Sequence, residues 1–148
     1  MTLGDSIRTV YAKYFTFSGR ASRSEFWWYQ LFYLIIVSIP LSIVSQTLDD
    51  IWTLINFIPS LAVSWRRLHD TDRSGLWNLL PAVGLPLMLL GFWFGGIEAI
   101  MSPFVLIGGF MMVACVILLI VWYAMAGTPG PNRFGNDPLN PTDADVFE

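Results

Sequence analysis

Charged side chains are scarce in this sequence of 148 residues. They make up 13% of the chain, whereas hydrophobic residues make up 55%. A soluble globular domain carries roughly 25% charged residues, so this chain cannot cover a water-facing surface with charge. The high hydrophobic content also excludes intrinsic disorder. With a net charge of −3, the chain lacks the basic footprint that nucleic-acid binding needs, and we expect no nucleic-acid partner.

Cysteine and histidine each occur once. The single cysteine, Cys115, excludes an internal disulfide and a metal site built from cysteines. His69 precedes Asp70, a pair found in metal-dependent phosphohydrolases, but those sites need further histidines. A serine hydrolase with Ser22 or Ser74 beside His69 is an alternative on paper, although the sequence has no G-x-S-x-G motif and no phosphate-binding loop. We therefore expect no enzymatic activity, no metal and no cofactor.

Four long stretches carry no charge: residues 26–48, 51–65, 74–97 and 99–132. A helix needs about 20 apolar residues to cross the hydrocarbon core of a bilayer. Tryptophans such as Trp27 and Trp122 stand at the ends of these stretches, as expected where aromatic rings meet lipid headgroups. The sequence thus predicts an all-α polytopic membrane protein with four transmembrane helices, at about 26–47, 49–67, 76–97 and 103–126.

The second stretch is short for a membrane crossing. Residues 51–65 rise only about 22 Å as a helix, so a re-entrant segment is the rival interpretation. The basic residues favour four crossings, because all eight lysines and arginines then lie on one side, in residues 1–25, 66–73 and 127–148. The positive-inside rule makes that side, with both termini, cytoplasmic.

The two ends of the chain differ from the apolar stretches. Apolar residues recur at helical spacing over residues 3–15, while Asp5 and Lys13 fall on the opposite face. This pattern predicts a short amphipathic helix that lies in the cytoplasmic interface or packs on the cytoplasmic loops. At the other end, turn-forming residues give way to acidic ones. We expect a single membrane domain over residues 1–138 and a flexible acidic tail over 139–148.

Three polar blocks lie on the predicted cytoplasmic side. Residues 19–27 read GRASRSEFW, residues 66–77 read RRLHDTDRSGLW, and residues 132–138 read NRFGNDP. In this order the blocks resemble the signatures of the domain of unknown function 805 family of small bacterial inner-membrane proteins. The resemblance implies a multi-pass protein of the bacterial inner membrane. That family has no established activity, so the resemblance implies no catalytic residues.

Arginine is concentrated in these blocks, where six guanidinium groups face the four carboxylates of Glu25, Asp70, Asp72 and Asp137. Arginine forks pair with carboxylates and phosphates through two hydrogen bonds. In a structural interpretation, the carboxylates lock the loops and the tail together. In a functional one, the surplus arginines hold a phosphate, that of an anionic lipid headgroup at the inner leaflet. The candidate residues are Arg20, Arg23, Glu25, Arg66, Arg67, His69, Asp70, Arg73, Asn132, Arg133 and Asp137.

We expect this protein to be a structural or interaction module of the membrane. Its arginine-rich face would bind anionic lipid headgroups or a membrane-protein partner, including a second copy of the chain. Charged residues within spans usually mark ion and proton paths, and the charge-free stretches argue against a proton-coupled pump. The alternative is a small-solute transporter or channel component, with a polar route lined by Ser38, Ser42, Asn56 and Ser60.

Overall fold

A computed structural model describes residues 1–140, apart from the side chain of Ile97. The described chain is helical and contains no strand, only an isolated bridge between Asn132 and Gly135. It forms two compact units, one of Met1–Gly75 with the segment that begins at Met125, the other of Leu76–Ala124. The all-helical prediction is confirmed over this range. The predicted flexible tail, from residue 141 onward, lies outside the described residues.

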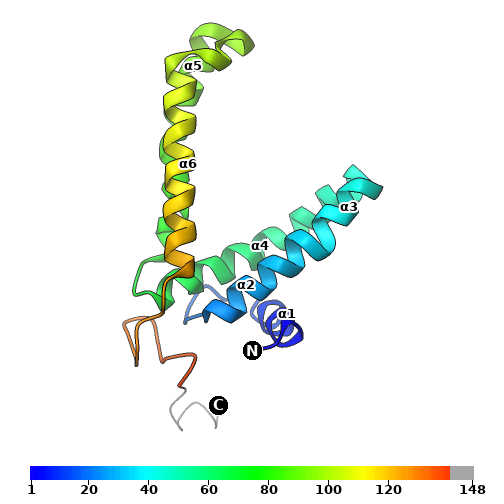
Figure 1. The fold of residues 1–148 in the computed structure, drawn as a ribbon, viewed down its shortest axis with the longest axis vertical. Helices are drawn as coiled ribbons and strands as arrows, with labels where there is room; N and C mark the ends of the chain where they lie inside the picture. The colour runs from blue at the N-terminus through cyan, green and yellow to red at the C-terminus, as the bar shows by residue number, and fades with distance from the viewer. Residues whose placement is uncertain (141–148) are drawn as a thin grey trace. The chain divides into compact units, whose positions relative to one another are not determined.

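The first unit is built on a helical hairpin. Helices α2 (Arg23–Leu31), η1 (a π-helix, Phe32–Ser38) and α3 (Ile39–Val44) follow one another as one rod, and α4 (Gln46–Asp70) returns beside it (Figure 1). The π-turns lie directly before Pro40, which has no N–H for the regular helical ladder, and a wider turn accommodates that loss. Ser45 reverses the chain in an extended conformation and caps α4 by accepting from Leu48 N–H at 3.4 Å.

Hydrogen bonds between the two rods establish their antiparallel register. Ser38 donates to Asp49 at 2.7 Å near the hairpin bend, and Tyr29 donates to Asn56 at 3.1 Å further along. At the opposite end Ala21 N–H donates to the Arg66 carbonyl at 3.0 Å. Residues progressively earlier in the first rod and the segment before it therefore pair with residues progressively later in α4, as in an antiparallel hairpin.

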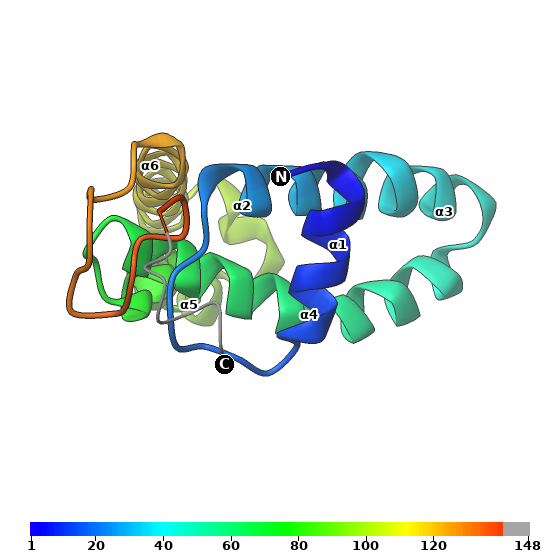
Figure 2. The ribbon, with the colours of Figure 1, turned by 90° about the horizontal axis from the view of Figure 1, so that it is seen from below.

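A short helix, α1 (Leu3–Ala12), lies across α2 and α4 (Figure 2). Thr2 and Asp5 cap its start reciprocally, in a capping box. Ser6 and Val10 are buried on its inner face, and Ser6 donates to the Glu25 carbonyl at 2.5 Å. The structure thus has a helix within residues 3–15, where the apolar periodicity predicts one. This helix packs on other helices of its unit. Its position at a membrane interface stays a prediction.

The second unit comprises η2 (a 3-10 helix, Gly75–Gly84) from Leu76 onward, α5 (Leu85–Gly95), η3 (Gly96–Met101) and α6 (Pro103–Ala124), with α5 packed against α6. Glycines allow this close approach. A Cβ atom on Gly84 would overlap the Gly108 carbonyl, and one on Gly91 would stand 2.6 Å from a methyl group of Val105. Small residues at such contacts are typical of helices that associate in membranes.

Within the described residues, three helical stretches are long and apolar enough to cross a membrane: Arg23–Val44, Gly75–Gly95 and Pro103–Ala124. Helix α4 is 25 residues long but is not among them, because polar and charged residues interrupt its apolar stretch at both ends. The first stretch also begins before the predicted position 26, since Ser22 caps a helix whose first turn already contains Arg23 and Glu25. The structure therefore supports three of the four predicted spans, and the second, over residues 49–67, stays a prediction.

Candidate functional site

Asp70, in the last turn of α4, receives two arginines from different parts of the first unit. Its Oδ1 accepts a hydrogen bond from Arg20 Nε at 2.9 Å, and Arg20 Nη2 lies 2.9 Å from the same oxygen. Its Oδ2 accepts from Arg67 Nη1. All three side chains are at least nine-tenths buried. A buried carboxylate shared by two guanidinium groups forms a fixed junction, because its charge offsets the cost of burying them.

The same two arginines bind the backbone of the C-terminal segment. Arg20 donates to the carbonyls of Gly130 and Thr128, each at 2.6 Å. Arg67 Nη2 donates to the Met125 carbonyl, and Thr128 N–H donates back to the Asp70 carbonyl at 2.8 Å. The junction thus attaches residues near position 128 to the start of the first rod and to the end of α4. This use of Arg20 and Arg67 matches the structural interpretation of the cluster.

Arg66 and Glu25 form a second buried pair. Arg66 Nη1 donates to Glu25 Oε1 at 2.6 Å, and Arg66 is 1% exposed. Nε and Nη2 of Arg66 have no hydrogen-bond partner within the part of the chain that the structure describes. Leaving buried donors unbonded costs about 1–3 kcal/mol each. This pair therefore ties α2 to α4 at an energetic cost that the Asp70 junction does not carry.

His69 is held in a fixed position beside the junction. Its Nδ1 lies 3.0 Å from the Gly19 carbonyl, and its ring stacks on Phe134 with centroids 3.8 Å apart. Asn132 Nδ2 donates to the His69 carbonyl at 2.9 Å. Burial lowers the pKa of His69 below its ordinary value, so a neutral ring that donates from Nδ1 fits the site. Ser22, one of the two serines considered as its partner, instead caps α2.

Three other predicted site residues have their own partners outside the junction. Arg133 pairs with Asp72 at 3.1 Å on the exposed surface and stacks on Phe134. Arg73 donates to the Thr71 carbonyl at 3.2 Å. Asp137 is held by backbone N–H groups instead, those of Leu139 at 2.9 Å and Gly130 at 3.2 Å. These bonds, with that of Leu139 first, lower the pKa of Asp137, which therefore is ionised at neutral pH.

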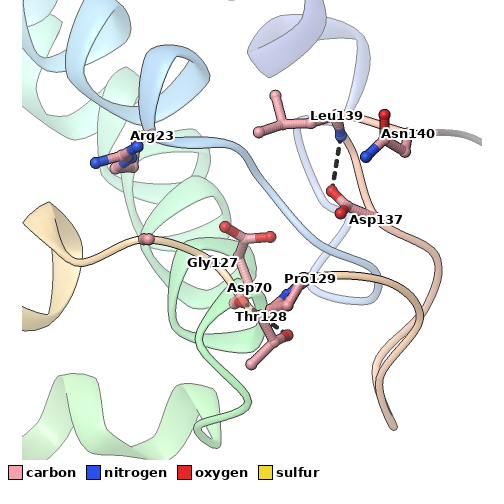
Figure 3. A pocket seen from close by; sticks show the side chains of 9 residues that line it. Arg23, Asp70, Gly127, Thr128, Pro129, Asp137, Leu139 and Asn140 are labelled. Atoms are coloured by element: carbon pink, nitrogen blue, oxygen red, sulfur yellow. Dashed lines mark hydrogen bonds between the residues drawn. The ribbon is translucent and has the colours of Figure 1, made fainter.

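A partly enclosed cleft of about 170 Å³ opens beside Asp70 (Figure 3). Arg23, the exposed first residue of α2, lines it. No hydrogen bond or ion pair of Arg23 is found among the described residues. The remaining lining residues are Asp70, Ala126, Gly127, Thr128, Pro129, Asp137, Leu139 and Asn140. The guanidinium group of Arg23 therefore lines the cleft without a hydrogen-bond or ion-pair partner in the described chain.

The structure therefore divides the predicted cluster. Arg20, Arg67 and Asp70 come together in the junction, with His69 and Asn132 packed beside it. The other predicted residues lie in separate pairs, in the outer loops or at the cleft. Sequence reasoning missed the carbonyl groups of Met125, Thr128 and Gly130 as arginine acceptors. Backbone groups carry no residue-specific signal, and the run of turn formers from Gly127 indicates turns without indicating what their carbonyls contact.

The polar residues considered for a solute route form hydrogen bonds within the first unit. Asn56 is fully buried and accepts from Tyr11 at 2.5 Å as well as from Tyr29. Ser42 donates to the Ile39 carbonyl at 2.8 Å. Such bonds are typical of polar groups that join helices to one another.

Comparison with known proteins gives one family and several relatives. The family profile described as "Protein of unknown function (DUF805)" matches residues 14–136. Inner membrane protein YhaI of Escherichia coli K12 is 35% identical over 136 residues, which cover 88% of this chain and 92% of that protein. Inner membrane protein YhaH of the same strain is 33% identical over 144 residues, covering 87% and 92%. The uncharacterized protein YiiR is 31% identical over 141 residues, covering 87% and 90%. No solved structure matches.

Proposed function

This chain belongs to the DUF805 family of proteins of unknown function, and from that premise we propose that it is an inner-membrane module whose arginine-rich face binds the phosphate of lipid headgroups. The relatives named above as inner membrane proteins support the location. The three apolar helical stretches of the described chain support an integral membrane protein.

Helix α4 serves as the second of four crossings in this proposal. It returns antiparallel to the first rod, which is itself long and apolar enough to span. Its 25 residues rise about 37 Å, more than the roughly 30 Å of a hydrocarbon core. Asp49 and Asp50 lie at one end, and Arg66 and Arg67 at the other. Under the positive-inside rule, this arrangement supports a cytoplasmic position for both termini.

Reporter fusions test the orientation. A cytoplasmic reporter and a periplasmic reporter are each fused after Asp50 and after Asn140. We expect the fusion after Asp50 to be active only in the periplasm and the fusion after Asn140 only in the cytoplasm. Activity of both fusions on the same side would overturn the crossing by α4.

The observation that carries lipid binding is Arg23. Arg20 and Arg67 are used by Asp70, whereas Arg23 is exposed and has no partner among the described residues. Trp27 and Trp28, 42% and 40% exposed, lie about one helical turn further along α2. Exposed tryptophans mark the depth of lipid headgroups. A guanidinium at that depth meets phosphates, with which it forms charge-assisted hydrogen bonds.

Lipid retention tests this proposal. The protein is extracted in mild detergent, and bound phospholipid is quantified by native mass spectrometry. We expect Arg23→Gln to lower phospholipid retention about tenfold, the effect of one lost charged hydrogen bond. Arg8→Gln removes the same charge from an exposed position on α1 and should leave retention unchanged. Wild-type protein without phospholipid, or equal retention by the Arg23 variant, would overturn lipid binding and leave a protein partner as the candidate for this face.

A further inference from the structure

Helix α4 contains a proline, Pro59, in its interior. Proline has no N–H, and its ring crowds the carbonyl of the residue four positions earlier. In the regular ladder of an α-helix that carbonyl, here of Ile55, accepts from the N–H of residue 59. Helix α4 nevertheless continues through Pro59 to Asp70. The Ile55 carbonyl therefore lacks the donor that any other residue type would supply at position 59.

Tyr14 supplies a donor to this carbonyl from another part of the first unit. It lies in the turn that follows α1, and its hydroxyl donates to the Ile55 carbonyl. Two backbone hydrogen bonds hold the turn, from Lys13 N–H to the Thr9 carbonyl and from Thr16 N–H to the Lys13 carbonyl, each at 3.0 Å. The phenol of Tyr14 thus reaches the carbonyl of α4 from a structured segment.

A second phenol of α1 reaches the next residue of α4 but binds a side chain. Tyr11 donates to Oδ1 of Asn56 at 2.5 Å. Tyr11 and Tyr14 are three residues apart, a spacing that puts side chains on one side of a helical chain. The two hydroxyls therefore reach neighbouring positions of α4. Only that of Tyr14 binds a backbone carbonyl that a regular helix would use within itself.

We propose that residues 3–16, which comprise α1 and the turn after it, act as a strap on the helical hairpin, and that the Tyr14 hydroxyl replaces the N–H that Pro59 lacks. Ser6 attaches the strap to α2 through the Glu25 carbonyl, and Tyr14 attaches it to α4 at the proline. In membranes, helices tolerate proline where neighbouring groups bind the freed backbone in this way. The strap therefore lets α4 pass through Pro59 without an unbonded carbonyl, a role that goes beyond lipid binding.

A double-mutant cycle between positions 14 and 59 tests the inference on the full-length, detergent-solubilised protein. Tyr14→Phe removes the hydroxyl and keeps the ring, whereas Pro59→Ala restores an N–H that can donate to the Ile55 carbonyl. We expect Tyr14→Phe to lower the unfolding temperature of the otherwise unchanged protein by about 2–4 °C, the shift that loss of one hydrogen bond gives in a chain of this size. In the Pro59→Ala background we expect a shift below about 1 °C.

Tyr11→Phe is the matched control for the cycle. It removes the same kind of hydroxyl from the same segment, but from a bond to the side chain of Asn56, which does not depend on the residue at position 59. Its effect on the unfolding temperature should therefore be equal with Pro59 and with alanine at that position. If Tyr14→Phe also has equal effects in the two backgrounds, Tyr14 does not replace the missing N–H, and the inference is overturned.

NMR observes the carbonyl directly and decides alone if Pro59→Ala does not fold. The sequence contains a single Ile-Asn step, Ile55–Asn56, so isoleucine labelled at its carbonyl carbon and asparagine labelled at its nitrogen identify this one peptide group. We expect Tyr14→Phe to move the Ile55 carbonyl resonance upfield, as loss of a hydrogen bond does. Tyr33→Phe, which removes a hydroxyl bound to the side chain of Thr53 at 3.4 Å, should leave it in place. An unchanged resonance in Tyr14→Phe overturns the inference. Neither experiment involves lipid or orientation, so both are independent of the tests of the proposed function.

Discussion

Arg20 Nε donates to Asp70 Oδ1 at 2.9 Å across 50 residues of sequence. The same carboxylate accepts from Arg67 one turn earlier on α4. One acidic side chain therefore balances two buried guanidinium groups from separate segments. Loss of the Asp70 carboxylate should therefore destabilise the first unit more than loss of a surface ion pair, which contributes about 0–1 kcal/mol.

Replacing Asp70 should destabilise the first unit strongly. Asp70→Asn leaves Arg20 and Arg67 buried without a compensating charge, and removing one partner of a buried ion pair costs about 3–5 kcal/mol. We expect a clear drop in the thermal unfolding temperature of the detergent-solubilised protein and a lower folded yield. Asp50→Asn is the matched control, because Asp50 is exposed. Equal unfolding temperatures of the two variants would contradict the role of Asp70 as the junction.

The pair of Arg66 and Glu25 should behave differently when both partners are changed. Glu25→Gln and Arg66→Met should each cost about 3 kcal/mol, since each leaves a buried charge unpaired. The double variant also removes the two donors of Arg66 that have no partner among the described residues. We therefore expect its cost to be well below the sum of the single costs. A double-mutant cycle on the free energy of unfolding measures this coupling, and additive costs would contradict it.

Gly127 should not tolerate a side chain. A Cβ atom there would overlap the carboxylate of Asp70, so Gly127→Ala must displace the junction or the C-terminal segment. Overpacking of this kind costs about 1–3 kcal/mol. At Gly4, on α1, a Cβ atom meets nothing within 4 Å, and Gly4→Ala should be neutral or slightly stabilising. Thermal unfolding of both variants checks the contrast, which fails if Gly127→Ala unfolds at the wild-type temperature.

Stability should fall below neutral pH because of His69. Burial holds the pKa of His69 below its ordinary value, which is about 6.5. As the pH falls through about 6.5, the unfolded chain therefore takes up a proton that the folded chain does not, and folding becomes less favourable. We expect the unfolding temperature to drop as the pH falls from about 7.5 to about 5.5, about one unit on each side of the ordinary pKa. His69→Gln should be less stable but flatter over this range, and an unchanged slope would contradict the assignment.

Sequence reasoning could predict the parts of this molecule that depend on composition. Charge-free stretches predicted the helical class and four spans, three of which the described chain supports, and the motif blocks indicated the family. The π-turns before Pro40 and the 3-10 helix up to Gly84 have no such signal. They arise where proline and close packing between helices act on the backbone, which depends on the tertiary arrangement.

The sequence also could not predict which arginine of the cluster pairs with which carboxylate. Six arginines and four carboxylates allow many combinations, and all carboxylates carry the same charge. The structure joins Asp70 to two arginines, whereas Asp137 is held by backbone N–H groups. Whether a carboxylate binds arginines or backbone N–H groups depends on the backbone geometry of the loops. A count of charges cannot distinguish the two arrangements.

The attachment of the C-terminal segment to Arg20 has a consequence for biogenesis. Ribosomes add about 5–20 residues per second, so Arg20 is synthesised several seconds before Thr128 and Gly130, whose carbonyls it binds. During that interval its guanidinium lacks two of its final acceptors. In a nascent chain halted before Thr128, Arg20 should therefore have Asp70 as a partner but lack these carbonyls, which only the longer chain supplies.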